Sequence, residues 1–139
     1  MRFSTIDFPG RLAAVVFCQG CPWRCGYCHN PELLDAAAPT AFAWEDVLAF
    51  LCQRRDLLDA VVFSGGEPTL QAGLPTALAQ ARALGYRTAL HTGGMYPARL
   101  TALLKLLDWV GLDIKAPWAR LDALTRSSGS ASAVPTRLL

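Results

Sequence analysis

The sequence lacks any apolar run long enough to cross a lipid bilayer. A membrane-spanning helix needs about 18–20 apolar residues, whereas the longest run without a charged residue, residues 68–81, is interrupted by Gln71, Gly73 and Pro75. An apolar signal segment followed by a small-residue cleavage site is also missing, because Asp7 interrupts the beginning of the chain. We therefore expect a cytoplasmic protein with no membrane partner.

Charged residues are scarce and scattered. They make up 17% of the 139 residues, and 13 cations against 11 acidic residues leave a net charge of +2. The cations form no cluster, so the sequence predicts no nucleic-acid-binding surface. Apolar residues make up 53% of the chain, which excludes a disordered protein. The length is that of a single domain.

Cysteine is the most informative residue that is present. The chain has five cysteines, of which Cys18, Cys21, Cys25 and Cys28 fall close together and Cys52 stands alone. Clustered cysteines in a chain without an export signal more often bind metal or carry redox chemistry than form disulfides.

Short apolar runs alternate with segments of helical periodicity. This order predicts an α/β fold, a partial (βα) barrel of about four parallel βα units. Strands are expected at residues 12–17, 60–63, 86–90 and 109–112, and helices at residues 44–51, 74–84, 100–107 and 118–125. We expect one domain over residues 1–126 and a flexible tail rich in serine, glycine and alanine over residues 127–139.

Unusual loops follow all four predicted strands. The carboxyl ends of parallel strands meet at one edge of a sheet, and this edge is where ligands bind in α/β folds. The sequence therefore predicts that residues 18–30, 64–68, 91–94 and 113–115 converge on one site.

The cysteine loop permits three interpretations. Cys21, Cys25 and Cys28 have C-x3-C-x2-C spacing and would hold three irons of a [4Fe–4S] cluster, leaving the fourth iron open. Adding Cys18 would give a four-cysteine electron carrier. Structural zinc is the third interpretation, although its ligand pairs are usually spaced further apart. We expect Cys18 and Cys52 to be buried thiols without a metal role.

Each of the other loops also has a functional and a structural interpretation. Gly65 and Gly66 let a backbone approach a ligand closely, and Glu67 would either receive an ammonium group or hold the loop by hydrogen bonds. Tyr27 would pack against an adenine or shield the cluster. Lys115 would clamp a carboxylate or form a solvated salt bridge.

Taken together, these motifs resemble the radical S-adenosylmethionine (SAM) enzymes. The resemblance rests on the three spaced cysteines, with Tyr27 before the last of them, and on the Gly-Gly-Glu-Pro sequence of residues 65–68. Ser-Thr-Ile-Asp-Phe-Pro-Gly at residues 4–10, Cys-His-Asn-Pro at 28–31 and Asp-Ile-Lys at 113–115 resemble the glycyl-radical-enzyme activases. The likeness covers roughly residues 3–126.

The resemblance implies two cofactors and their contacts. Cys21, Cys25 and Cys28 would hold a [4Fe–4S] cluster, and SAM would bind its open iron. Tyr27 would lie near the adenine and Lys115 near the methionine carboxylate. The residues implied to contact SAM are Tyr27, Gly65, Gly66, Glu67, Thr92, Asp113 and Lys115.

It also implies a reaction and partners. Reductive cleavage of SAM would lead to hydrogen abstraction from a glycine of anaerobic ribonucleoside-triphosphate reductase, with a flavodoxin- or ferredoxin-type protein as electron donor. The chain departs from the family at His91, where related activases often have an acidic residue. It also supplies four βα units where the family usually has six, so it is expected to be C-terminally short. The alternatives are a radical SAM enzyme acting on a small molecule, or a non-catalytic iron–sulfur or zinc module.

Overall fold

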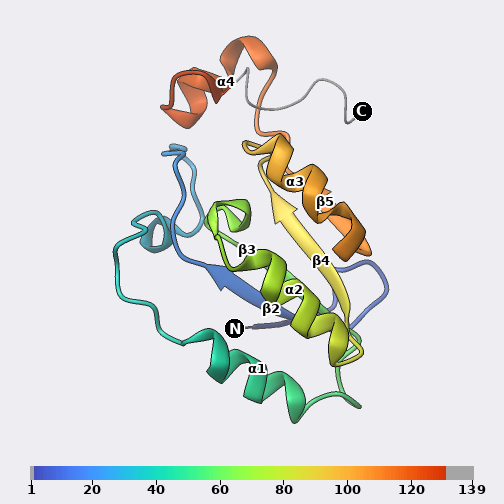
Figure 1. The fold of residues 1–139 in the computed structure, drawn as a ribbon. Coiled ribbons are helices and arrows are strands. Elements are labelled where there is room, and N and C mark those ends of the chain that lie inside the picture. Colours follow the sequence, from blue (N-terminus) through green and yellow to red (C-terminus); the bar gives the residue numbers. More distant parts are fainter. Residues whose placement is uncertain (1, 131–139) are drawn as a thin grey trace.

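The centre of the molecule is a parallel sheet. The computed structural model describes residues 2–130. Neighbouring strands pair in parallel in the order β2 (Ala13–Cys18), β3 (Ala60–Gly65), β4 (Arg87–Thr92) and β5 (Trp109–Leu112), as Figure 1 shows in part. The predicted α/β fold built from four parallel strands is confirmed.

A fifth strand was missed from the sequence. β1 (Arg2–Ser4) pairs antiparallel with β2, so the sheet is mixed rather than wholly parallel. Three residues are too few to show the alternation by which a strand is found in a sequence. β1 is also an edge strand, and its Phe3 side chain is exposed.

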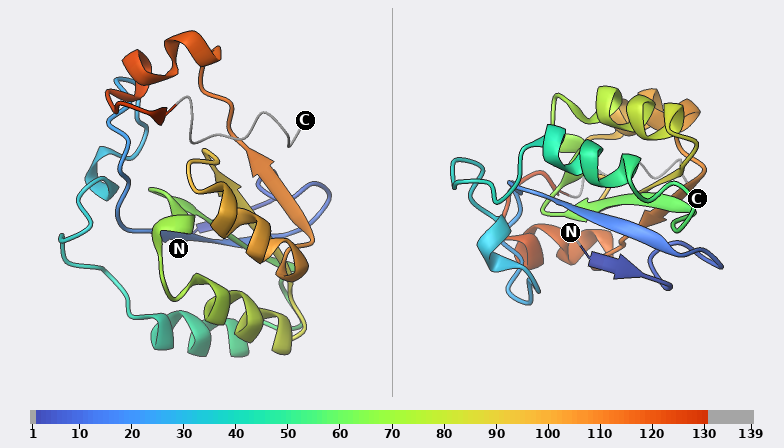
Figure 2. Two further views of the ribbon diagram at one scale, coloured as in Figure 1. Left: turned by 45° about the horizontal axis from the view of Figure 1, so that its top comes forward. Right: turned by 90° about the horizontal axis from the view of Figure 1, so that it is seen from below.

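Three helices cover one face of the sheet. α1 (Trp44–Cys52), α2 (Leu74–Ala83) and α3 (Pro97–Leu103) lie together on this side, as Figure 2 shows. The apolar stripe predicted as one helix to Leu107 instead tightens into a 3-10 turn, η3 (Leu104–Leu106), after α3. The core between sheet and helices contains the fully buried Leu51, Phe63, Leu78 and Leu90. Each such side chain contributes about 1.5–3 kcal/mol by leaving water.

The other face of the sheet carries three alanines besides Val15 and Val62. Ala13, Ala60 and Ala89 are completely buried there, beneath Phe8 and Trp109. Phe8 belongs to the segment between β1 and β2, so this segment closes the second face. Because both faces of the sheet are covered, the carboxyl ends of the strands remain accessible for a functional site.

Asp108 fastens the start of β5 to β4, and its removal should be measurable. Its Oδ2 accepts hydrogen bonds from Thr88 N at 2.8 Å and from Arg82 Nη1 at 2.7 Å. Although burial raises the pKa of Asp108, the Thr88 bond and the Arg82 charge lower it more, so the net pKa lies below its usual value. A carboxyl whose native pKa is depressed stabilises the fold above its unfolded pKa of about 3.9 and loses that contribution as pH falls through the native value.

We expect Asp108→Asn to lower the free energy of unfolding by about 1–3 kcal/mol at pH 7, because it weakens charge-assisted bonds. The difference should shrink below pH 4 as the wild-type carboxyl takes up its proton. Urea denaturation of the apoprotein at pH 7 and pH 3 measures both values. Asp56→Asn, at an exposed position, is the control. An Asp108 variant as stable as the control would contradict this prediction.

α4 (Trp118–Thr125) stands apart from the other helices, beside the cysteine loop (Figure 1). Thr125 O accepts a hydrogen bond from Arg24 N at 2.7 Å. The segment expected to be a flexible tail begins at residue 127. Its Ser130 Oγ lies 2.9 Å from Thr125 Oγ1, so residues 127–130 remain tied to α4, and residues 131–139 lie outside the described part. Across residues 2–130, no helix has the length and apolarity needed to span a membrane.

Candidate functional site

The loops at the carboxyl ends of the strands surround one cavity of about 580 Å³. Residues following β2, β3, β4 and β5 all contribute to its wall, as the order of elements predicted. All of the residues proposed from the sequence as cluster or SAM contacts line it: Cys21, Cys25, Cys28, Tyr27, Gly65, Gly66, Glu67, Thr92, Asp113 and Lys115.

Backbone hydrogen bonds fix the path of the cysteine loop. Gly20 N donates to Leu33 O at 2.8 Å and Cys21 N donates to Leu34 O at 3.1 Å, which ties the loop to the turn η1 (Pro31–Leu33). Gly20 has a φ of +96°, a conformation that favours glycine. The loop is therefore shaped by its own return segment before any metal is added.

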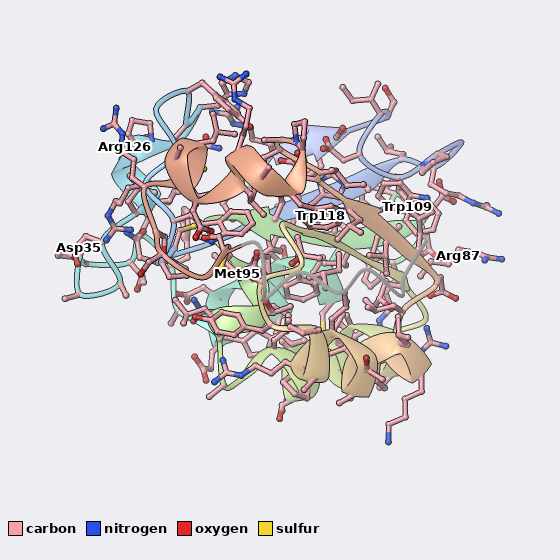
Figure 3. The ribbon with its side chains drawn as sticks, turned by 90° about the horizontal axis from the view of Figure 1, so that it is seen from above. Asp35, Arg87, Met95, Trp109, Trp118 and Arg126 are labelled. Atoms are coloured by element: carbon pink, nitrogen blue, oxygen red, sulfur yellow. The ribbon has the colours of Figure 1, made fainter. Side chains whose placement is uncertain are left out.

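Trp23 anchors the cysteine loop and also lines the cavity. Its side chain is buried with Met95 and with Leu121 of α4. Figure 3 looks down on this region and shows Met95 between α4 and the layer that holds α3. A Cβ atom at Gly93 would lie 2.5 Å from the Trp23 ring, so the loop after β4 must have glycine there. Trp23 was not singled out from the sequence, because its neighbours come from distant segments.

The four thiols of the cysteine loop differ in whether they face the cavity. Cys21, Cys25 and Cys28 are free and line the cavity, whereas Cys18 packs against the core under the helices and is absent from the cavity wall. Burial, with a smaller effect of the Glu67 charge, raises the pKa of Cys18 to about 12. These positions favour three thiolate ligands and a buried Cys18. Cys52, which was expected to be buried, is instead exposed at the end of α1.

The three free thiols that line the cavity are not arranged around a single ion. Within residues 2–130, no three His, Cys, Asp or Glu side chains gather closely enough to hold one metal ion. A structural zinc site needs four ligands around one ion, but each thiolate of a [4Fe–4S] cluster binds a different iron. The residues present therefore fit a cluster held by Cys21, Cys25 and Cys28.

The glycines after β3 allow two loops to touch backbone to backbone. Gly66 N donates to Cys18 O at 2.9 Å, and Glu67 N donates to Gly20 O at 2.8 Å. A Cβ atom at Gly66 would lie 2.3 Å from Gly20 O, and Gly65 has a φ of +105°. Neither position has room for a side chain. The Gly-Gly pair thus joins this loop to the cysteine loop while both line the cavity.

The Glu67 side chain is occupied by protein donors. It is 1% exposed. Oε1 accepts from Thr69 N at 3.0 Å, from Thr92 Oγ1 at 2.7 Å and also from the Thr69 hydroxyl, while Oε2 accepts from Gly93 N at 3.1 Å. Three of these bonds are to Oε1 and one is to Oε2, so protein donors meet most of the acceptor capacity of the carboxylate. Of the two interpretations drawn from the sequence, the geometry favours holding the loops over receiving an ammonium group.

Lys115 brings a cation to the cavity wall. Its Nζ lies 2.5 Å from Asp113 Oδ2 and 5.7 Å from the centre of the Tyr27 ring. Burial lowers the pKa of Lys115, but the hydrogen bond and charge of Asp113 raise it more, so the amine stays protonated. Asp113 remains largely exposed and Tyr27 is 47% exposed. Lys115 therefore forms a salt bridge with Asp113 and lines the cavity at the same time, so the two interpretations drawn from the sequence do not exclude each other.

His91 and Trp109 form a part of the wall whose role was not assigned from the sequence. His91 Nε2 lies 3.0 Å from Asp7 O, and its Nδ1 lies 3.4 Å from Ser64 Oγ. The Trp109 ring meets the His91 ring edge-on, with centroids 5.4 Å apart. Both rings cover Gly111, where a Cβ atom would lie 2.7 Å from Trp109. The sequence feature that could have indicated this packing is the glycine at position 111, two residues after Trp109 in β5.

Comparison with known proteins identifies the family of the chain. The family model described as the Radical SAM superfamily matches residues 15–134. A glycyl-radical enzyme activating enzyme of Methanocaldococcus jannaschii is 30% identical, over 98% of this chain and 57% of that protein. The pyruvate formate-lyase-activating enzyme of Clostridium pasteurianum is 38% identical, over 79% of this chain and 48% of that protein. The chain thus spans about half the length of these relatives.

A solved structure shares the fold. Streptococcus suis SuiB, bound to precursor peptide SuiA, superposes with a TM-score of 0.53 and 21% identity, over 70% of this chain and 22% of that one. Because the Radical SAM family model matches residues 15–134, the chain belongs to the radical SAM superfamily, whose members use the two cofactors predicted from the sequence, a [4Fe–4S] cluster and S-adenosylmethionine.

Proposed function

We propose that the chain is an activase that generates a glycyl radical on anaerobic ribonucleoside-triphosphate reductase. The observation that carries the proposal is the meeting of three free thiols, a Gly-Gly backbone and the Lys115 cation in one cavity. Relatives at 30–38% identity that are named as activating enzymes support the reaction class. When bound, the cluster and SAM supply a reductive cleavage of the sulfonium bond that makes hydrogen abstraction from carbon possible.

The proposed role of the cysteine loop is to hold the cluster at three corners. Cys21, Cys25 and Cys28 would be its ligands. Trp23 and α4 back this loop, which limits its movement and keeps water from one side. A rigid and partly dry wall suits chemistry in which competing reactions with solvent must be avoided.

The proposed SAM contacts surround the same cavity. Lys115 would face the methionine carboxylate, because an anion leaving water needs a cationic partner, and Asp113 would orient Lys115 through their 2.5 Å contact. The exposed face of Tyr27 would pack on the adenine. Backbone groups of Gly65 and Gly66 would meet the amino group. Thr92 and Glu67 belong to the same wall through their 2.7 Å bond.

The choice of partner rests on sequence motifs. Residues 4–10, 28–31 and 113–115 resemble the activating protein of anaerobic ribonucleoside-triphosphate reductase. Pyruvate formate-lyase is the second candidate partner, since relatives from Clostridium pasteurianum and Escherichia coli are named for its activation, at 38% and 34% identity. A flavodoxin- or ferredoxin-type protein would supply the electron. A cytoplasmic location is part of the proposal, because an open iron is oxidised in air.

An activation assay tests the proposal. The reconstituted chain is incubated anaerobically with SAM, a reductant and either reductase or pyruvate formate-lyase, and the glycyl radical is measured by electron paramagnetic resonance (EPR). We expect a radical on the reductase, and none with Cys25→Ala as the matched control. A radical on pyruvate formate-lyase alone would reassign the partner. SAM cleavage without a radical on either protein would favour a small-molecule substrate.

A further inference from the structure

Glu67 is a buried carboxylate that forms no ion pair with any cation among the described residues 2–130. Its side chain is 1% exposed. Among the ion pairs of residues 2–130, none includes Glu67, and its partners are two hydroxyls and two backbone amides. Neutral donors stabilise a carboxylate but leave its net charge in place. Such a charge is costly to bury, so its place beside the cavity calls for an explanation.

The hydrogen bonds of Glu67 connect the loops that follow β2, β3 and β4. Its N–H donates to Gly20 O at 2.8 Å, one residue before Cys21. Its carboxylate holds Thr92 at 2.7 Å and Gly93 N at 3.1 Å at the end of β4. Glu67 and all three proposed ligands line the same cavity. Its charge therefore acts on the thiolate loop from a fixed position.

Glu67 lies next to the cysteine loop, because its N–H donates to Gly20 O and its side chain lines the cavity that Cys21, Cys25 and Cys28 also line. Negative charge added to that loop would be repelled by a carboxylate in this position. The electrostatic effect is the same whether negative charge arrives by loss of a proton or by gain of an electron. In a site partly shielded from water, this repulsion is stronger than it would be at the surface.

We propose that Glu67 is a positioning residue whose buried negative charge holds the reduction potential of the cluster low while its bonds tie the surrounding loops together. The inference rests on the proposed function, since it assumes a cluster on Cys21, Cys25 and Cys28. The Glu67 charge would disfavour the addition of an electron beside it, so a cluster held by these thiols would be harder to reduce. The same charge would make that cluster, when reduced, a stronger electron donor.

The test compares the charge of Glu67 with its hydrogen bonds. Glu67→Gln removes the charge in nearly the same shape, whereas Glu67→Asp keeps the charge but shortens the reach to Thr92 and Gly93. Glu45→Gln removes the same charge from an exposed position on α1 and is the matched control. Each reconstituted full chain is titrated with a reductant, and the cluster's midpoint potential is read by EPR.

We expect Glu67→Gln to make the cluster at least tenfold easier to reduce, a positive shift of about 59 mV for a one-electron couple. Glu67→Asp should lose thermal stability yet keep a midpoint near that of the wild type, as should Glu45→Gln. A midpoint unchanged in Glu67→Gln, or moved equally in the control, overturns the inference.

Two further results keep the test decisive. If Glu67→Gln does not fold, Thr69→Val removes one hydroxyl donor and leaves the charge less compensated, so its midpoint should move in the negative direction. A Thr69→Val midpoint that is unchanged or raised overturns the inference. A wild-type chain that takes up no iron in reconstitution overturns the proposed function itself, which separates the two failures.

Discussion

Cys25→Ala should lower the bound iron of the anaerobically reconstituted chain nearly to zero, whereas Cys18→Ala should leave it close to the wild-type value. Cys25 lines the cavity with the other two proposed ligands. Cys18 is the last residue of β2 and packs against the core under the helices. Loss of one of three ligands leaves a cluster held at two corners, while loss of a buried thiol removes only packing, at a cost of about 1 kcal/mol.

Iron and sulfide analysis of both variants measures this difference. EPR spectra before and after adding SAM extend it, since a changed signal in Cys18→Ala would show that the open iron is retained. Cys52→Ala, at an exposed position away from the cavity, controls for general effects of losing a cysteine. Equal loss of iron in Cys18→Ala and Cys25→Ala would establish four protein ligands and favour the electron-carrier or zinc interpretation.

Gly66→Ala should be the most damaging conservative substitution in the chain. The added Cβ would lie 2.3 Å from Gly20 O and 3.1 Å from Cys18 O, which are backbone atoms that no rotamer change can move away. Over-packing typically costs about 1–3 kcal/mol, and contact with backbone on two sides places this case at or above the upper value. The displaced atoms belong to the cysteine loop, so cluster binding should fall together with stability.

Thermal unfolding of the apoprotein and iron content after reconstitution measure the two effects. Gly73→Ala is the matched control: a Cβ there meets nothing within 4 Å, and its φ of −78° is open to any residue. The control should stay within about 1 kcal/mol of the wild type. A Gly66→Ala chain that unfolds and binds iron like the control would show that the two loops are not in contact.

The elements that position the site were predictable because each leaves a local signal. Buried parallel strands appear as continuous apolar runs, such as residues 60–63, and their spacing implies the crossover helices. Once the strands are parallel, the position of every following loop is set by topology. This is why Cys21, Gly65, Thr92 and Lys115 were expected at one edge of the sheet and are found on one cavity wall.

The remaining features depend on contacts between distant segments. Whether Glu67 faces a ligand or neighbouring donors is decided by Thr92 and Gly93, which belong to another loop. Trp23 is buried by residues from distant segments, Met95 and Leu121 of α4. β1 is too short for any period to appear. Sequence patterns report which side chains are apolar and how they repeat, but not which partner completes a hydrogen bond.

The position of α4 has a consequence for the order in which the molecule can be assembled. The ribosome makes Cys21, Cys25 and Cys28 early, but the helix that backs their loop, through Arg24 N and Thr125 O, is made near the end of the described chain. During synthesis the three thiols therefore leave the ribosome before the helix that backs their loop has been made, and the contact between Arg24 and Thr125 can form only after both segments are present.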